Sequence, residues 1–440
     1  MESLGQWLDR QYAHAATAML VSISPVGVVK TRPGFAQTVR PVKGSIVASP
    51  VLAAYDPDPD YFFHWYRDSA VVVDALRLLF EDGSVGAEGL GHFRDFVRFS
   101  RSLQQLDGRA LVAIPSWRAQ VAPDFVKFLR TEADLASVHG EAVAGETRVN
   151  PDATLDISSW PRPQHDGLAT RALSLLRWTR SVSIEDEIGA ELAALLRSDL
   201  WFIARHWREP SFDIWEEEKG LHYYTLCVTA AALESGAEWL EANDDRQAVP
   251  GYRADVEVIR RTLDDFWLPE AGHYRSRVLT SGAASSKQLD IAIILAAIHA
   301  GHSGAHSAQD PRMHATLARL ESLFDAAYAI NRERCAHTAP AMGRYAGDVY
   351  YSGGAYYFST LGAAEFCFRA AAGNKDARGW IEHGDAFLTT VRAFTPANGD
   401  MSEQFDQHTG AQSSARHLAW SYAALISCVA ARRAVMGTAA

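Results

Sequence analysis

The sequence predicts an all-α protein assembled from helical hairpins. Twelve segments carry apolar residues at the spacing of an amphipathic helix, and mostly short loops connect them in pairs. Two of these segments, 289–300 and 419–431, are apolar on nearly every side, as expected of helices buried inside a second helical layer. No alternation of strands with helices indicates a parallel sheet. We therefore expect an array of helical hairpins in which some helices are fully enclosed.

The apolar periodicity also places each element along the chain. The expected helices comprise residues 1–18, 70–80, 88–106, 165–181, 188–207, 222–242, 251–266, 286–301, 311–331, 353–372, 376–393 and 413–434. Residues 21–51 are rich in Val, Gly, Pro and Ser and predict irregular strands and loops, and residues 140–157 predict a small hairpin.

Composition limits both the organisation and the partners of the chain. Its 440 residues, 48% of them hydrophobic, can bury a large core, and no linker rich in Pro, Gly or Ser divides them, so we expect one domain over residues 1–440. The 42 Lys and Arg against 53 Asp and Glu give a net charge of −11, which disfavours nucleic acid and anionic membranes as partners. The 12 Trp and 15 Tyr suit sugar binding, because sugar C–H faces pack on aromatic rings.

Redox state and location follow from the cysteines and the N-terminus. Cys227, Cys335, Cys367 and Cys428 show no metal-binding spacing and are expected to be buried thiols. The first residues contain acids and Arg10 where a secretory signal needs a basic flank and an unbroken apolar segment. No apolar run reaches the roughly 18 residues of a membrane span. We expect a cytoplasmic monomer without a membrane partner.

The strongest single signal for catalysis is the stretch 211–225, SFDIWEEEKGLHYYT. Three consecutive carboxylates follow Trp215, and a carboxyl group held against an apolar wall has a raised pKa, as a general acid requires. A run of acidic residues is also typical of a solvated surface, so the local sequence leaves both interpretations open.

Four further clusters resemble this stretch, because each combines a carboxylate or Arg with aromatic residues and precedes an expected helix. They are residues 61–69, 160–167, 343–357 and 400–420. If alternate helices form an inner ring, the loops at one end of the ring converge, and all five clusters become neighbours. Within the first cluster, Asp68 or Ser69 could instead be a simple helix N-cap.

The five clusters resemble, in order and spacing, the motifs of glycoside hydrolase family 15, the glucoamylase family, from about Ile46 to Leu425. The matching segments read YFFHWYRDS, PRPQHDG, DIWEE, GRYAGDVYY and SEQFDQHTGAQSSARHLAWSYAAL. The resemblance implies an (α/α)6 barrel of twelve helices in two concentric layers, with small irregular or β excursions. It also implies an exo-acting hydrolase that inverts the anomeric carbon, releases glucose from α-glucan ends and needs no metal or organic cofactor.

By motif position, the general acid corresponds to Glu216 and the general base to Glu403. This agrees with the chemistry of inversion, in which one carboxylic acid protonates the glycosidic oxygen while one carboxylate activates water. The resemblance further implies a substrate-binding role for Glu217 toward the next sugar, for Arg67 and Asp68 on the terminal glucose, and for other pocket residues. These are Tyr61, Trp65, Trp160, Trp215, Arg344 and Trp420.

Departures from the family pattern weaken the prediction of linkage. Residues Gly354-Ala355-Tyr356 stand where fungal members have Asn-Pro-Trp, and His417 stands where they have Asp; we expect both differences to lie away from the pocket floor. The resemblance makes an α-1,4 linkage the first expectation. Short oligosaccharides are the expected substrates, since neither an N-terminal β-sandwich nor a starch-binding domain is expected. An α-1,6-specific glucohydrolase, a family trehalase and a sugar-binding protein without catalysis are the alternatives.

Overall fold

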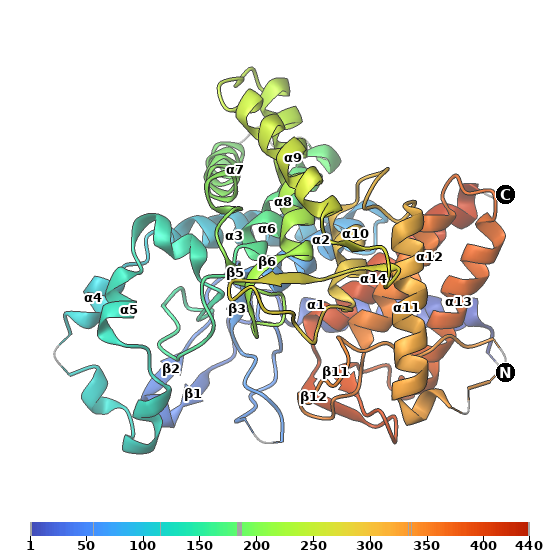
Figure 1. Ribbon diagram of the computed structural model, residues 1–440. Coiled ribbons are helices and arrows are strands. Elements are labelled where there is room, and N and C mark those ends of the chain that lie inside the picture. The colour runs from blue at the N-terminus through green and yellow to red at the C-terminus, as the bar shows by residue number, and fades with distance from the viewer. Residues whose placement is uncertain are drawn as a thin grey trace.

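A computed structural model describes residues 2–55, 57–114, 116–182, 187–332, 334–335 and 337–438. Six helices of this part of the chain form a closed inner ring, in which each helix packs on the next and the last returns to the first (Figure 1). They are α2 (Tyr66–Glu81), α6 (Asp166–Ser181), α8 (Tyr223–Ala242), α10 (Ala292–Ala300), α12 (Tyr357–Ala371) and α14 (Ala419–Thr438).

Six outer helices alternate with the inner ones along the chain. They are α1 (Leu4–Leu20), α3 (Ala87–Leu103), α7 (Glu187–His206), α9 (Val249–Asp264), α11 (Pro311–Ala327) and α13 (Ala377–Phe394). The outer α3 buries one stripe, including Phe93, Phe96 and Val97, whereas the inner α12 is buried on nearly every side. The expected (α/α)6 barrel of two concentric helical layers is therefore confirmed.

Local chemistry explains where the outer helices begin. Ser3 and Gln6 form a reciprocal capping box at the start of α1. Asp310 accepts from the backbone N–H of Arg312 at the start of α11, and Pro311 occupies the first helical position, where its missing N–H costs nothing.

Three inner helices begin later than the periodicity predicts, at residues 292, 357 and 419 instead of 286, 353 and 413. Residues 286–291 form a loop because Asp290 is turned inward, where it accepts from the indole Nε1 of Trp215. Residues just before α12 and α14 form strands instead of helix. Apolar content alone does not separate a buried strand or loop from the first turn of a helix.

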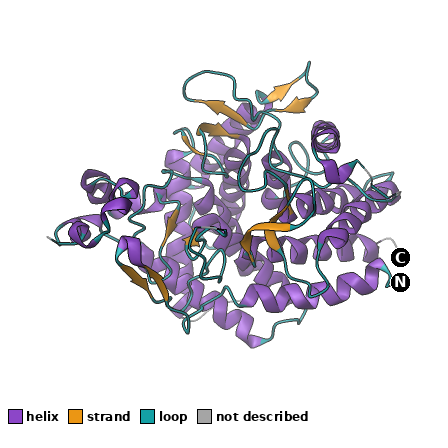
Figure 2. Ribbon diagram, turned by 90° about the horizontal axis from the view of Figure 1, so that it is seen from below, coloured by secondary structure: helices purple, strands orange, loops and turns teal. Residues whose placement is uncertain are grey.

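The short strands join the segments that precede the inner helices, and in Figure 2 they lie among the loops between the helices. Strand β3 (His64–Trp65) pairs with β4 (Arg148–Val149), and β6 (Lys219–His222) lies between β5 (Ser211–Phe212) and β9 (Arg277–Leu279). Strand β11 (Ser402–Phe405) lies between β10 (Ala355–Tyr356) and β12 (Gln412–Arg416). Elsewhere β1 (Lys30–Arg32) pairs with β2 (Gln37–Val39), and β7 (Trp267–Leu268) pairs with β8 (His273–Tyr274).

The segment between α3 and α6 is more structured than predicted. It contains α4 (Gly108–Val112), α5 (Glu132–Ser137) and the 3₁₀ helices η2 (Arg118–Gln120), η3 (Pro123–Phe128) and η4 (Gly140–Gly145). The hairpin expected over 140–157 is reduced to a bridge between Val149 and Leu155, because β4 pairs mainly with β3. Two more 3₁₀ turns are η1 (Pro33–Phe35) and η5 (Ala329–Asn331).

One large hydrophobic core joins both helical layers. Cys227, Cys367 and Cys428 are buried in it, but Cys335 is exposed, because it follows η5 in a loop outside the helices, so the expectation of a buried thiol there was wrong. Among the described residues, no helix combines the length and apolarity needed to cross a bilayer.

Candidate active site

Glu216 occupies the tight turn between β5 and β6. Its backbone is left-handed, with φ of 62°, and its N–H donates to the carbonyl of Asp213. A non-glycine residue in this region is strained and persists only where surrounding contacts hold it. The Glu216 side chain is 10% exposed, so it is not part of a solvated acidic surface.

Three predicted site residues hold the Glu216 carboxyl group. Trp65 Nε1 donates to Oε1 at 3.0 Å, Arg67 Nη2 donates to the same oxygen at 3.2 Å, and Trp160 Nε1 donates to Oε2 at 2.8 Å. Both oxygens are thereby fixed in orientation by residues up to 151 positions away. The carboxyl group is preorganised for proton transfer to or from a bound substrate.

Arg67 and Asp68 form a buried charged cluster with Asp166, the first residue of α6. Arg67 Nη1 lies 3.3 Å from Asp166 Oδ2, and Nη2 lies 3.2 Å from Asp68 Oδ2. Burial raises the pKa of Asp68 to about 6, although Arg67 opposes this, and burial raises the pKa of Asp166 to about 6 as well.

Trp65 is the N-cap residue of α2 and no side chain caps the helix, so the N-cap interpretation of Asp68 or Ser69 was wrong.

Two buried polar atoms of this cluster have no hydrogen-bond partner among the described residues, Arg67 Nε and Asp166 Oδ1. Leaving such an atom unpaired costs about 1–3 kcal/mol. Both atoms are almost completely enclosed by the protein, so this cost falls on the charged cluster itself.

Glu403 lies on β11, 8% exposed. The hydroxyl of Ser414, on β12, donates to its Oε2. The pairing of β11 with β12 shifts register between Ser402 and Gln404, and Ser414 has a left-handed backbone there. This bulge brings the Ser414 hydroxyl onto the carboxyl group.

The burial of Glu403 raises its pKa to about 7. The hydrogen bond from Ser414 and the charge of Arg344 lower this pKa, whereas the charges of Asp68 and Asp348 raise it. Asp68 in turn is affected by the charge of Glu216, so it lies within electrostatic reach of both candidate catalytic carboxyl groups.

Glu217 points to a different set of groups. Its Oε1 accepts from Arg344 Nη2 at 3.2 Å and from the Tyr345 hydroxyl at 2.7 Å, and its Oε2 accepts from Lys287 Nζ at 2.6 Å. Arg344 is itself clamped by Asp348, with Nε–Oδ2 and Nη2–Oδ1 distances of 2.6 and 2.7 Å. Sequence reasoning did not assign Lys287 a role and placed it inside a helix.

Aromatic side chains surround these charged groups. The Tyr61 ring lies 5.2 Å from that of Trp65, and the Tyr61 hydroxyl lies 2.7 Å from that of Tyr350. Trp65 and Trp160 meet edge to face at 6.2 Å. Tyr350 was not singled out, although the GRYAGDVYY motif contains it.

A second group of rings forms a stack below Arg67. Phe358 lies 4.4 Å from Trp420 and 5.9 Å from Trp215, with the planes nearly parallel, and the Arg67 guanidinium lies 5.3 Å from the Trp420 ring. Trp215 therefore packs in this stack, while Trp65 and Trp160 supply the indole contacts to Glu216. Phe358 gave no signal in the sequence beyond its helical spacing.

One departure from the family pattern is closer to the site than expected. The Tyr356 hydroxyl donates to Asp348 Oδ2 at 3.1 Å, and its ring lies 5.2 Å from that of Phe358, so Tyr356 supports both the Arg344 clamp and the ring stack. The expectation that this position lies away from the pocket floor was wrong. His417, in contrast, packs on Tyr422 with a side chain that is 39% exposed.

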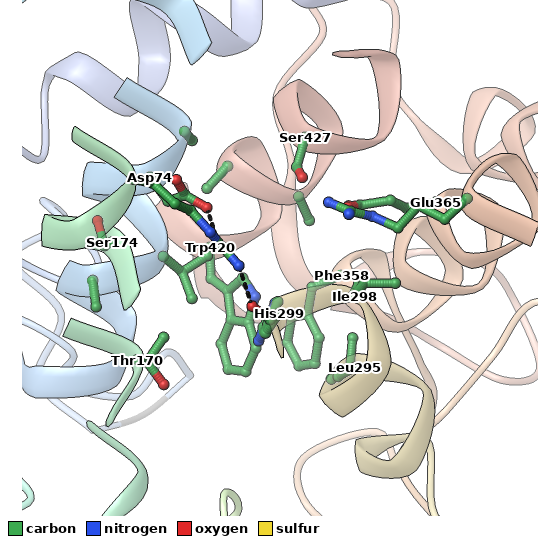
Figure 3. Close-up of a pocket in the computed structure, with 17 residues that line it drawn as sticks. Asp74, Thr170, Ser174, Leu295, Ile298, His299, Phe358, Glu365, Trp420 and Ser427 are labelled. Carbon is green, nitrogen blue, oxygen red and sulfur yellow. Dashed lines mark hydrogen bonds and ion pairs between the residues drawn. The ribbon is translucent and has the colours of Figure 1, made fainter. Parts of the chain in front are cut away.

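A cavity of about 40 Å³ lies inside the inner ring and borders this ring stack (Figure 3). Trp420, Phe358 and His299 line it together with Asp74, which is paired with Arg177. Glu216 and Glu403 do not line this cavity. Within the described part of the chain, no three His, Cys, Asp or Glu side chains are arranged to hold a metal ion.

Comparison with known proteins identifies relatives of this chain. The sequence is 28% identical to the "Probable glucoamylase" of Schizosaccharomyces pombe, over 99% of this chain and 93% of the relative. It is 25% identical to glucoamylase 1 of Rhizopus oryzae, over 96% and 70% of the two chains.

Solved structures show the same fold. The glucoamylase of Hypocrea jecorina superposes with a TM-score of 0.81 at 24% identity, covering 98% of this chain and 73% of that one. The glucoamylase of Saccharomycopsis fibuligera superposes with a TM-score of 0.77 at 21% identity, covering 99% and 96%. The sequence profile of glycosyl hydrolases family 15 matches residues 138–430, and the chain belongs to this family of glycoside hydrolases.

Proposed function

We propose that this enzyme is an exo-acting, inverting glucosidase that releases β-glucose from the non-reducing ends of α-1,4-linked gluco-oligosaccharides. One observation carries the proposal: Arg67 Nη2 lies 3.2 Å from Asp68 Oδ2 and 3.2 Å from Glu216 Oε1, so the buried Arg67–Asp68 pair adjoins the candidate acid. A glucose unit bound to Arg67 and Asp68 would lie next to the carboxyl group of Glu216, and the proposal places Glu403 on its other face.

In this mechanism Glu216 acts as general acid and Glu403 as general base. Glu216 protonates the glycosidic oxygen, and the hydrogen bonds from Trp65 and Trp160 keep its carboxyl group in place. Glu403 removes a proton from a water molecule that attacks the anomeric carbon from the opposite face. The Ser414 hydroxyl, which donates to Glu403, stabilises the ionised form that a base requires.

The closed end of the site accounts for exo action. Arg67 and Asp68 lie on the buried side of Glu216, where the Asp68 carboxylate and the Arg67 guanidinium N–H groups are chemically suited to the hydroxyl groups of one terminal sugar. The ring stack of Trp215, Phe358 and Trp420 packs beside Arg67, and a site closed at this end would admit the end of a chain and exclude its middle.

The α-1,4 linkage is supported by the glucoamylases of S. pombe and R. oryzae, which resemble this chain over nearly all its length. A hydrolysis panel of maltose, isomaltose, trehalose and maltoheptaose tests the proposal. We expect maltose and maltoheptaose to be cleaved fastest, with glucose as the first product from both. Preferred cleavage of isomaltose or of trehalose would replace the proposed linkage, and hydrolysis of none would overturn the proposed activity.

A further inference from the structure

The loop of residues 280–291, between β9 and α10, borders the candidate active site. It is held on both sides of Lys287. On one side the Ser285 hydroxyl donates to Glu218 at 2.8 Å, and on the other Asp290 accepts from Trp215 Nε1 at 2.9 Å. The backbone of Lys287 is therefore fixed, and its side chain extends from an ordered support.

The Lys287 ammonium group is only partly used by the protein. It lies 2.6 Å from Glu217 Oε2 and 4.6 Å from the centre of the Tyr345 ring, and its side chain is 21% exposed. An ammonium group has three N–H donors. Among the described residues Glu217 is its one hydrogen-bond partner, so donors remain for a ligand.

Exposure indicates which part of a substrate these groups meet. The Glu216 side chain is 10% exposed and that of Glu217 is 26% exposed, so Glu217 and Lys287 lie on the outer side of the candidate acid. A general acid contacts the glycosidic oxygen, which joins the retained glucose to the leaving sugar. Because Arg67 and Asp68 occupy the buried side, the outer side borders the leaving sugar.

We propose that Lys287 is a specificity-determining residue for the leaving sugar. Its ammonium group donates to one hydroxyl of that sugar and holds Glu217 in position to accept from another. The enzyme thereby favours carbohydrate leaving groups over leaving groups that lack hydroxyls. This inference rests on the proposed glucosidase function.

Two substrates that differ only in the leaving group test the inference. Maltose leaves a sugar, and 4-nitrophenyl α-D-glucopyranoside leaves an aromatic group without sugar hydroxyls. For Lys287→Met we expect kcat/KM to fall about 10-fold or more on maltose but to stay within about 2-fold on the aryl glucoside, because only maltose loses a charge-assisted hydrogen bond. Lys287→Arg, which keeps the charge and the donors, should restore part of the activity on maltose.

Two further variants serve as controls. Lys219→Met removes a positive charge from an exposed position of β6 and should leave kcat/KM on both substrates unchanged. Glu217→Gln should lower activity on maltose, and its combination with Lys287→Met should lower it by less than the product of the two single effects, because the two side chains act together.

The possible failures are distinguishable. An equal loss on both substrates would make Lys287 a general structural residue, and no loss on maltose would remove it from substrate contact; either result overturns the inference while the glucosidase function stands. A wild-type enzyme that hydrolyses neither substrate would overturn the proposed function and the inference with it.

Discussion

The Ser414 hydroxyl donates to Glu403 Oε2 across the bulged pair β11–β12. It lowers the pKa of a carboxyl group that burial raises to about 7. If Glu403 is the base, it works only when ionised, so activity falls as pH drops through this pKa. Ser414→Ala should raise the pKa further and move the acid limb of the kcat/KM profile to higher pH. Ser413→Ala is the matched control, because Ser413 bonds Ser352 instead, and an unmoved acid limb in Ser414→Ala would contradict the assignment.

The raised pKa of Glu403 also predicts a pH-dependent cost in stability. The folded protein binds this proton up to about pH 7, whereas the unfolded chain releases it near pH 4.5, the ordinary pKa of a Glu side chain, so ionisation destabilises the fold as pH rises. Glu403→Gln removes this cost and should raise the free energy of unfolding above pH 7 by up to about 3 kcal/mol. Urea unfolding at pH 4 and pH 8 measures the difference. The gain should be small at pH 4, and a gain of equal size at both pH values would point to a packing effect.

The two candidate catalytic residues should be separately indispensable. General acid and general base catalysis each contribute about 10²–10⁴-fold, so Glu216→Gln and Glu403→Gln should each lower kcat on maltose by at least about 100-fold. Both variants should keep wild-type circular dichroism, because Gln preserves the shape of the side chain and one of its two acceptor oxygens. Glu217→Gln should be milder in kcat, since its carboxyl group contacts Arg344, Tyr345 and Lys287. Near-native turnover in either of the first two would refute its role.

Asp68→Asn tests the closed end of the site. Its carboxylate pairs with Arg67 beside Glu216, so its loss should lower kcat/KM about 10-fold or more for every substrate, whatever the linkage or length. Asp74→Asn is a matched control from the same helix, because Asp74 lines the inner cavity and pairs with Arg177. A defect confined to long substrates would place Asp68 outside the terminal-sugar site.

Stereochemistry tests the mechanism without assuming a linkage. An inverting enzyme leaves about 6.5–9.5 Å between its two carboxyl groups for a water molecule, whereas a retaining enzyme uses the second carboxylate as nucleophile. Proton NMR of the first product, taken before mutarotation, should show β-glucose from an α-linked substrate. Initial release of α-glucose would exclude the role of base for Glu403.

Much of the fold follows from the sequence alone. All twelve expected helices are present. Each carries an apolar stripe, or apolar residues on every side, and this pattern can be read from the local sequence because it determines which faces of a helix are buried. The candidate catalytic residues can also be identified from the sequence, since Glu216 lies in the motif DIWEE and Glu403 in the motif that begins with SEQ.

The tertiary structure decided what each of these residues touches. Trp65 meets Glu216 across 151 positions, and Ser414 meets Glu403 through a strand bulge that has no periodic signal. The buried Asp290, bonded to Trp215, holds residues 286–291 out of the helix that their periodicity favours, and so places Lys287 against Glu217. Such contacts depend on which buried polar groups find partners once the ring of helices has closed, because desolvation makes an unpaired carboxylate or indole N–H costly. Local sequence periodicity carries no information about that pairing.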